Sequence, residues 1–227
     1  PDFLSPGAYE LRRLMASAVR FGVVSMSQES VDVAREELLG IIYKQSGRMA
    51  DILNELLDLA RIEARRGKDF VFETLQVQTL VQEVLDGYKL PPQRRLPRMD
   101  MPAEPRFILA DRSKACQVIV NVLSNAYKYS PQGGDVRVEL VQGAHDDGLP
   151  DLGLRISDFG IGMTPEQVSH IFERFYRADA SGKIPGSGLG MSIVKEIVDL
   201  HGGRVEVSSR PGLGTSVTLW FLVPTAT

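Results

Sequence analysis

The sequence has one cysteine, Cys116, among 227 residues, so no disulfide can form within the chain. A single cysteine is typical of proteins from a reducing compartment, and we expect a cytoplasmic protein. No run of about 18 apolar residues is present, which argues against a membrane-spanning helix. The opening stretch PDFLSPGAYE has neither a basic region nor an apolar core, so it does not read as a secretory signal peptide.

The chain also lacks an initiator methionine, from which we expect a fragment of a longer protein. Any attachment to a membrane is then expected in the upstream part. There is no excess of basic charge, because the formal net charge is -3 and the lysines and arginines are spread along the chain. This distribution predicts no nucleic-acid partner. Hydrophobic residues make up 43% of the sequence, which is enough for a packed core in one or two domains.

Strand signals are scarce in the first 66 residues, where the pattern predicts two helices joined by a turn. The second helix has a seam that steps by four and three residues: Leu38, Ile42, Gln45, Met49, Ile52, Leu56, Leu59 and Glu63. A period of about 3.5 residues is typical of coiled-coil packing. One hairpin cannot bury both of its faces, so we expect residues 1–67 to form a four-helix bundle in a homodimer. Packing of the seam on the chain's own second half is the alternative.

Residues 68–227 alternate strand and helix patterns, which predicts an α/β sandwich domain with helices on one face of an antiparallel or mixed sheet. Strands are expected at 69–74, 106–110, 135–142 and 151–158 and in a hairpin over 204–223. Helices are expected at 77–88, 112–130, 164–176 and 189–203. The proline-rich stretch 90–105 is expected to have no regular structure.

The helix expected at 112–130 carries two amide side chains on one face. Asn121 and Asn125 lie four residues apart, and apolar residues occupy the opposite side. An amide oxygen is a hard, neutral ligand that suits a Mg²⁺ ion carrying phosphate oxygens. Lys128, one turn further on, can reach a phosphate as a point charge. An ordinary polar helix face is the alternative interpretation.

Two glycine-containing stretches follow this helix. In SDFGIGM, Asp158 ends a strand, and its carboxylate can accept a hydrogen bond from an adenine amino group, while Gly160 and Gly162 let the backbone approach a flat ring. In GSGLGMS, glycines precede a helix whose first N–H groups can bind phosphate. Between them, FERFYRAD combines aromatic residues with Arg174 and Arg177. Each pattern alone is a weak signal, because ordinary turns also need glycine.

The four stretches follow one another in a fixed order within residues 121–190. In this order they resemble the N, G1, F and G2 boxes of the ATP-binding domain of sensor histidine kinases, which has the GHKL or Bergerat fold. The stretch DILNELLDLARIE resembles the second helix of that family's dimerisation and phospho-acceptor domain. The resemblance covers nearly the whole chain and implies ATP and Mg²⁺ as cofactors.

The resemblance also implies roles for single residues. Asn125 would hold Mg²⁺ with Asn121 beside it, and Asp158 would bind the adenine. Arg177 would stabilise charge on the transferred phosphoryl group. A lid is expected over residues 178–188. The other residues implied for the pocket and lid are Lys128, Tyr129, Gly160, Gly162, Gly186, Gly188, Leu189 and Gly190.

The family's acceptor motif, H-E-L-R-T-P-L/M, corresponds to YELRRLM at residues 9–15, with Tyr9 in place of the histidine. All three histidines of the chain lie outside the hairpin: His145, His170 and His201. A phenol with a pKa of about 10 is a poor nucleophile without a base, and the adjacent Glu10 can serve as one. The replacement of histidine by tyrosine resembles the DivL-type kinases.

Three functions follow, in order of preference. The first is a histidine-kinase relative that no longer phosphorylates itself but binds ATP and acts on a response-regulator receiver domain or another histidine kinase. The second is an active kinase that uses Tyr9 or a residue of a partner. The third is a GHKL ATPase related to gyrase, in which a glutamate four residues before the Mg²⁺ asparagine activates water. Asn121 stands at that position and cannot act as a base.

Arg13 and Leu14, in place of the family's threonine and proline, would alter the surface that meets a receiver domain.

Overall fold

The computed structural model describes residues 32–130, 133–144, 150–179 and 184–224. Contacts divide the chain into two units, residues 1–60 and 61–227. Tyr9, Glu10 and the first expected helix lie outside the described residues. No helix in the described part of the chain is long and apolar enough to cross a membrane.

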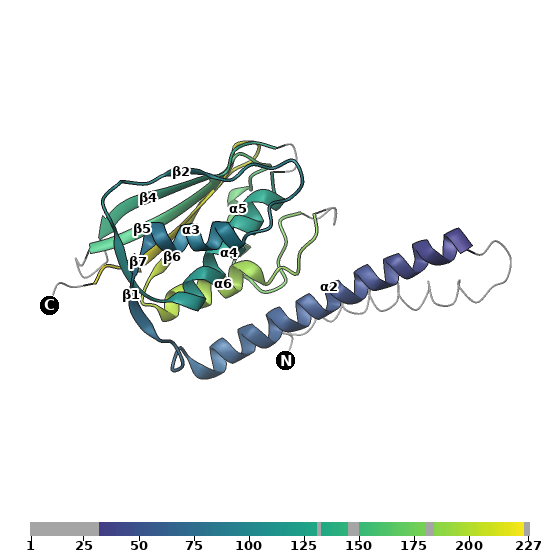
Figure 1. Ribbon diagram of the computed structural model, residues 1–227, viewed down its shortest axis with the longest axis horizontal. Helices are drawn as coiled ribbons and strands as arrows, with labels where there is room; N and C mark the ends of the chain where they lie inside the picture. The colour runs from purple at the N-terminus through teal and green to yellow at the C-terminus, as the bar shows by residue number, and fades with distance from the viewer. Residues whose placement is uncertain (1–31, 131–132, 145–149, 180–183, 225–227) are drawn as a thin grey trace. The chain divides into compact units, whose positions relative to one another are not determined.

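Helix α2 spans Asp32–Arg65 and is the second helix expected from the sequence (Figure 1). The pattern of buried and exposed side chains along α2 agrees with the predicted seam. From residue 39 on, the seam positions are half-buried, and Leu59 is buried, whereas Tyr43, Leu53 and Leu57 are exposed. The helix is followed by Gly67 with a φ of 71°, a left-handed conformation that commonly ends helices.

The main sheet has five strands in the order β2-β4-β5-β7-β6. Their bounds are Arg98–Asp100 for β2, Arg137–Ala144 for β4, Pro150–Asp158 for β5, Arg204–Arg210 for β6 and Gly214–Leu222 for β7. Strands β4, β5, β7 and β6 pair antiparallel, and β2 pairs parallel with β4. The sheet is therefore mixed, and the hairpin predicted over 204–223 forms β6 and β7.

The expectation that residues 90–105 lack regular structure is wrong at β2. This strand occupies three of the four residues between Pro97 and Pro102, where every backbone N–H is available. Arg98 N–H donates to the Val136 carbonyl at 2.7 Å, which starts the pairing with β4. The prolines limit the strand's length but leave room for an edge strand.

A second, two-stranded sheet joins β1, Phe72–Gln76, to β3, Phe107–Asp111, in antiparallel register. Strand β1 begins three residues later than expected, and β3 is shifted by one residue from the expected range. Leu75 and Ile108 face each other across the two strands and are both buried. This small sheet leads directly into helix α4 at Arg112.

Helices α3, Val77–Gly87, α4, Arg112–Lys128, and α6, Gly190–Leu200, cover one face of the main sheet (Figure 1). The core lies between these layers. Residues from both layers surround one small internal void: Val77, Leu80, Ile108, Ile119, Leu140, Leu152, Leu154 and Phe221. On β5 the buried apolar residues alternate, so the residues between them face away from the helices.

The helix expected over 164–176 is shorter than predicted, because α5 spans only Pro165–His170. Its start is as expected. The Thr164 hydroxyl accepts from Gln167 N–H at 3.2 Å, and the Gln167 amide oxygen accepts from Thr164 N–H at 2.9 Å. The helix cannot continue through Phe175, which has a φ of 63°. Phe175 N–H instead donates to the Gly188 carbonyl at 2.9 Å.

Candidate functional site

The two asparagines predicted to bind Mg²⁺ lie in the second half of α4, and both are half-buried. The helix begins at the Asp111 cap, whose carboxylate accepts from Lys114 N–H at 3.0 Å. It ends at Tyr129, whose N–H donates to the Asn125 carbonyl at 2.9 Å. Lys128, in the last turn, is exposed. Among the described residues no three histidine, cysteine, aspartate or glutamate side chains gather as a metal site.

The first turn of α6 lies beside the amide of Asn121. A Cβ placed on Gly190 would stand 3.9 Å from both the Cγ and the Oδ1 atoms of Asn121. Gly190 is the first residue of α6, and Leu189 precedes it as the buried N-cap. The fold therefore brings the amide face of α4 next to backbone N–H groups at the start of a helix. Such N–H groups are a favourable place for a phosphate.

Asp158 is buried at the end of β5. Its Oδ1 atom accepts a hydrogen bond from Gly160 N–H at 2.8 Å. Burial raises the pKa of Asp158, and hydrogen bonds from Gly160, Thr215 and Ser130 together with the charge of Arg94 oppose this rise. The carboxylate is thus held in a fixed position by groups from several parts of the fold.

The turn after Asp158 packs tightly against the end of α4. A Cβ on Gly160 would lie 2.0 Å from the Tyr129 carbonyl oxygen, which also accepts a hydrogen bond from Ile161 N–H at 3.0 Å. Gly162 has a φ of 64°, and a Cβ there would lie 1.9 Å from the Arg210 carbonyl oxygen. Only glycine fits at these two positions. The structure therefore brings together Tyr129, Asp158 and the two glycines.

Arg177 and Asp179 both bind the backbone of Ile184. The Arg177 guanidinium donates to the Ile184 carbonyl, and Asp179 Oδ2 accepts from Ile184 N–H at 2.9 Å. The Arg177 and Asp179 side chains are 3.9 Å apart and only 17% and 10% exposed. These contacts fix residues on both sides of the segment 180–183, within the expected lid.

Tyr129 lies close to this pair. Burial raises the pKa of the Tyr129 phenol, while the positive charge of Arg177 lowers it and the negative charge of Asp179 raises it. Arg177 Nε is buried and has no hydrogen-bond partner among the residues that the structure describes, whereas another guanidinium nitrogen binds Ile184. A buried N–H without a partner is unfavourable, so an acceptor that reached this donor would be bound favourably.

Steric crowding requires glycine at only some positions of the glycine-rich stretch. Gly188 binds Phe175, as described above, and its φ is 77°. A Cβ on Gly186 would meet nothing within 4 Å, so no crowding requires a glycine there. The residues of this site that the structure brings together are therefore Asn121 with Gly190, and Tyr129 with Asp158, Gly160 and Arg177.

Sequence reasoning missed Arg94, which lies in the proline-rich connection. Its guanidinium donates to the Ser130 carbonyl at 2.6 Å and to the Gly134 carbonyl at 3.3 Å, and it stands 5.0 Å from the centre of the Tyr127 ring. Its charge also acts on Asp158. No local pattern predicts this role, because its partners come from a distant part of the chain.

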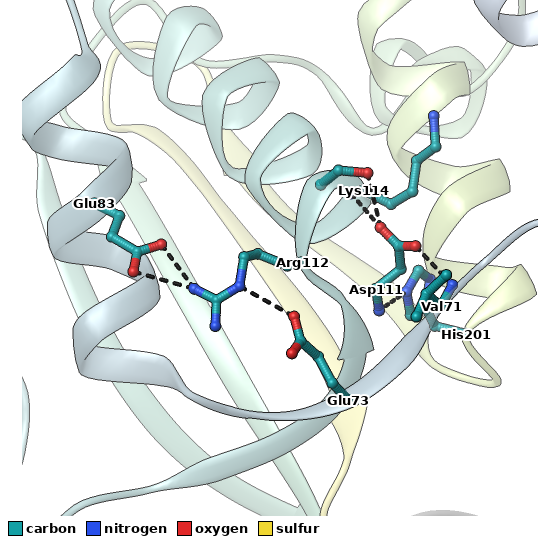
Figure 2. A network of polar contacts seen from close by, with 8 residues as sticks. Val71, Glu73, Glu83, Asp111, Arg112, Lys114 and His201 are labelled. Carbon is teal, nitrogen blue, oxygen red and sulfur yellow. Dashed lines mark hydrogen bonds and ion pairs between the residues drawn. The ribbon is translucent and has the colours of Figure 1, made fainter.

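A second polar network ties β3 to the end of α6 (Figure 2). Asp111 N–H donates to His201 Nε2 at 3.0 Å, and His201 Nδ1 lies 2.7 Å from the Ile197 carbonyl oxygen. Because Nε2 accepts, we assign the proton to Nδ1. Burial lowers the pKa of His201, opposed by the Ile197 hydrogen bond and the Asp111 charge. Asp111 Oδ2 in turn accepts from Val71 N–H at 2.8 Å.

Arg112 extends this network along the surface (Figure 2). Its Nε atom donates to Glu73 Oε1 at 3.0 Å, and its Nη1 atom donates to Glu83 Oε2 at 2.9 Å. These ion pairs connect β1, α3 and the start of α4. Both carboxylates and the guanidinium are about half exposed, so the pairs orient the elements more than they stabilise them.

Comparisons with known proteins agree with this arrangement. The family described as histidine kinase-, DNA gyrase B- and HSP90-like ATPase matches residues 110–225. Sensor histidine kinase WalK of Bacillus subtilis is 29% identical over 224 residues, which is 96% of this chain and 36% of that protein. This chain therefore spans about a third of WalK.

Two solved structures share the fold. Acinetobacter baumannii histidine kinase AdeS has a TM-score of 0.68 at 20% identity, over 96% of this chain and 98% of that chain. Full-length ShkA in complex with AMPPNP has a TM-score of 0.66 at 22% identity, over 100% of this chain and 47% of that chain. With the matched family covering residues 110–225, these findings show that the chain belongs to the histidine kinase-, DNA gyrase B- and HSP90-like ATPases and contains a sensor histidine kinase core.

Proposed function

We propose that the chain binds ATP with Mg²⁺ between α4, the turn after Asp158 and the start of α6, and that it acts in two-component signalling. The observation that carries this proposal is the proximity of the Asn121 amide to Gly190 at the start of α6. It sets an amide-bearing helix face beside N–H groups suited to phosphate. The similar fold of ShkA, which was solved with AMPPNP, supports a nucleotide ligand.

In this proposal Asn125 holds Mg²⁺ and Asn121 lies beside the phosphates. The buried carboxylate of Asp158 accepts a hydrogen bond from the adenine amino group. Gly160 keeps the turn close to the end of α4, and Gly162 keeps it close to Arg210 at the end of β6. Lys128 is exposed at the end of α4 and can approach a phosphate as a mobile charge. The lid residues of this proposed site are Gly186, Gly188 and Leu189, with Gly190 at the start of α6.

Arg177 is proposed to stabilise negative charge on the terminal phosphate. Its support is the buried Nε donor, which has no partner in the described part of the chain, and the position of its charge near Tyr129. Tyr129 then lies at the border between pocket and lid. The guanidinium donates to the Ile184 carbonyl and lies close to Asp179, and its side chain is mostly buried. These contacts hold it in one orientation before a ligand binds.

For the whole protein we propose a regulator that does not phosphorylate itself. Residues 1–67 would form the dimerisation hairpin of a homodimer, and residues 68–227 the ATP-binding domain. A receiver domain of a response regulator, or another histidine kinase, would bind the hairpin near Tyr9. Tyr9 replaces the acceptor histidine, and phosphotyrosine is a stable ester that passes its phosphoryl group on poorly. This resembles the DivL-type arrangement.

An active kinase that uses Tyr9, with Glu10 as its base, is the second candidate. A labelling experiment distinguishes this kinase from the regulator that does not phosphorylate itself. The purified chain is incubated with Mg²⁺ and γ-labelled ATP, and nucleotide binding is measured in parallel. The regulator requires binding that is weakened in Asn125→Ala and no label on the protein. Acid-stable label that disappears in Tyr9→Phe would instead establish the kinase.

A hydrolytic ATPase is disfavoured by Asn121, because an amide cannot deprotonate water. Release of inorganic phosphate in the same reactions tests this point. Phosphate release that survives in Tyr9→Phe and is lost in Asn125→Ala would favour the ATPase over the regulator.

A further inference from the structure

The face of the main sheet that points away from the helices is polar. Strand register places Arg137, Ser157, Ser216 and Ser208 in one row across β4, β5, β7 and β6. The next row contains Glu139, Arg155, Thr218 and Glu206. Leu154 and Ile156, which alternate with these residues on β5, are buried in the core. The two rows therefore lie on the opposite face of the sheet from the helices.

A groove of about 380 Å³ is hollowed into this face. Three arginines from three different strands line it: Arg137 of β4, Arg155 of β5 and Arg210 of β6. The volume lies within the range of roughly 300 to 1,000 Å³ that small-molecule sites occupy. The chain as a whole carries a net charge of -3, so this concentration of cations is local.

None of these three guanidinium groups has an ion-pair partner in the part of the chain that the structure describes. Arg155 Nε donates to Thr218 Oγ1 at 3.3 Å, and Arg137 stands 5.8 Å from the centre of the Phe159 ring. Glu139 is in register directly opposite Arg155, yet no ion pair joins them. On the same sheet Arg204 pairs with both Asp151 and Glu206, so unpaired arginines are not a general property of this face.

The hydroxyl groups of the groove add at least one more donor. Ser157 and Ser216 are 2.8 Å apart, and one donates to the other, which leaves the accepting hydroxyl with its own proton free. Ser209 is different, because it donates to the Gly214 carbonyl at 3.0 Å and its proton is used. Thr215 therefore donates to Ser209, at 2.8 Å.

Two carboxylates, Glu139 and Asp158, also line the groove. Asp158 is engaged by Gly160 N–H at 2.8 Å and by the backbone N–H of Thr215. Glu139, by contrast, has no such hydrogen bond from any residue that the structure describes. Three arginines thus face a single available carboxylate, and the groove favours an anionic ligand.

We propose that this groove binds a small phosphorylated molecule, on the face of the sheet opposite the helices that form the proposed ATP pocket. A phosphate monoester carries nearly two negative charges and three acceptor oxygens. It can therefore use donors that converge from several strands, whereas a carboxylate is satisfied by one bidentate arginine. The three guanidinium groups and the free Ser157 or Ser216 hydroxyl supply that set of donors. The groove shares Asp158 with the proposed ATP pocket, but the proposal does not require ATP to bind.

The test is an NMR titration of the full chain with inorganic pyrophosphate, with inorganic phosphate as the weaker probe. The arginine Nε–H signals and the backbone amides of Ser208 and Ser216 report on the groove. We expect saturable shifts of these signals. The double variant Arg155→Gln, Arg210→Gln should weaken the affinity by about tenfold or more, because charge-assisted hydrogen bonds are lost.

Arg106→Gln is the matched control, since Arg106 lies outside the groove and its pair with Glu104 is long, at 3.8 Å. Its affinity for pyrophosphate should be unchanged. If the double variant unfolds, Arg210→Gln alone serves, because Arg210 is exposed at the end of β6.

Pyrophosphate can also enter the proposed ATP pocket, which the amides of Asn121 and Gly190 report. Repeating the titration in Asn125→Ala separates the two sites, so that failure of one proposal leaves the other testable. Groove signals that do not shift, that never saturate, or that shift equally in the double variant would overturn the groove site.

Discussion

The backbone N–H of Asp111 donates a hydrogen bond to Nε2 of His201, which lies 90 residues further along the chain and 3.0 Å away. The imidazole is enclosed by aromatic rings, with the centroids of Phe70 and Phe72 at 5.0 and 5.1 Å and that of Phe221 at 5.8 Å. The residues that follow α2 are thus attached to the core through a neutral, buried histidine.

Stability should fall as the pH drops below about 6.5. Burial lowers the pKa of folded His201, so the unfolded chain takes up a proton at a higher pH than the folded chain. The contribution of His201 to the free energy of unfolding is complete above the pKa that His201 has in the unfolded chain. It is lost as the pH falls from there towards the pKa of His201 in the folded chain. Urea unfolding at pH 7.5 and pH 5.5 measures it, and His201→Gln should reduce the difference.

His170→Gln is the control for this pH dependence. His170 is exposed, and its hydrogen bond to Glu173 raises its pKa, so its contribution has the opposite sign and fades as the pH rises. An unchanged pH dependence in His201→Gln would show that another group is responsible.

Gly160→Ala should destabilise the fold and weaken nucleotide binding. The new Cβ would stand 2.0 Å from the Tyr129 carbonyl oxygen, so the turn must move away from α4 and carry Asp158 with it. We expect a loss of about 1–3 kcal/mol, as for other overpacked sites. Urea unfolding and nucleotide titration measure the two effects. Gly87→Ala at the end of α3, where a Cβ also meets nothing within 4 Å, should lower neither quantity.

Asn125→Ala should remove the dependence of nucleotide affinity on Mg²⁺. The half-buried amide is the proposed metal ligand, and alanine offers no oxygen in its place. Titrations with and without Mg²⁺ should converge in this variant, while the exposed Asn54→Ala of α2 should behave like the parent chain. A Mg²⁺ effect of full size in Asn125→Ala would rule out Asn125 as the ligand.

Arg177→Ala should weaken the binding of ATP more than that of ADP. If the guanidinium meets the terminal phosphate, its charge matters only when that phosphate is present. The loss for ATP should be about tenfold, as expected for one charge-assisted hydrogen bond. Arg174→Ala removes a neighbouring arginine as a control. Equal losses for ATP and ADP would indicate that Arg177 only orders the lid through Ile184 and Asp179.

The features that the sequence predicted correctly depend on residues that are close together in the chain. The start of the helix at residue 164 and the amide face of α4 follow from residues close together in the sequence, and both were predicted. The early end of α5 was missed because Phe175 binds Gly188, and β2 was missed because its partner β4 lies beyond α4. Arg94 escaped notice for the same reason, since the Ser130 and Gly134 carbonyls reach it from distant sequence.

Strand β2 also has a consequence for how molecules of this protein behave in concentrated solution. It covers the side of β4 that would otherwise present an open row of backbone donors and acceptors. Pro97 and Pro102 on either side of β2 have no N–H, so a neighbouring molecule could add only a very short strand there. This three-residue strand therefore protects one edge of the sheet against strand-by-strand aggregation.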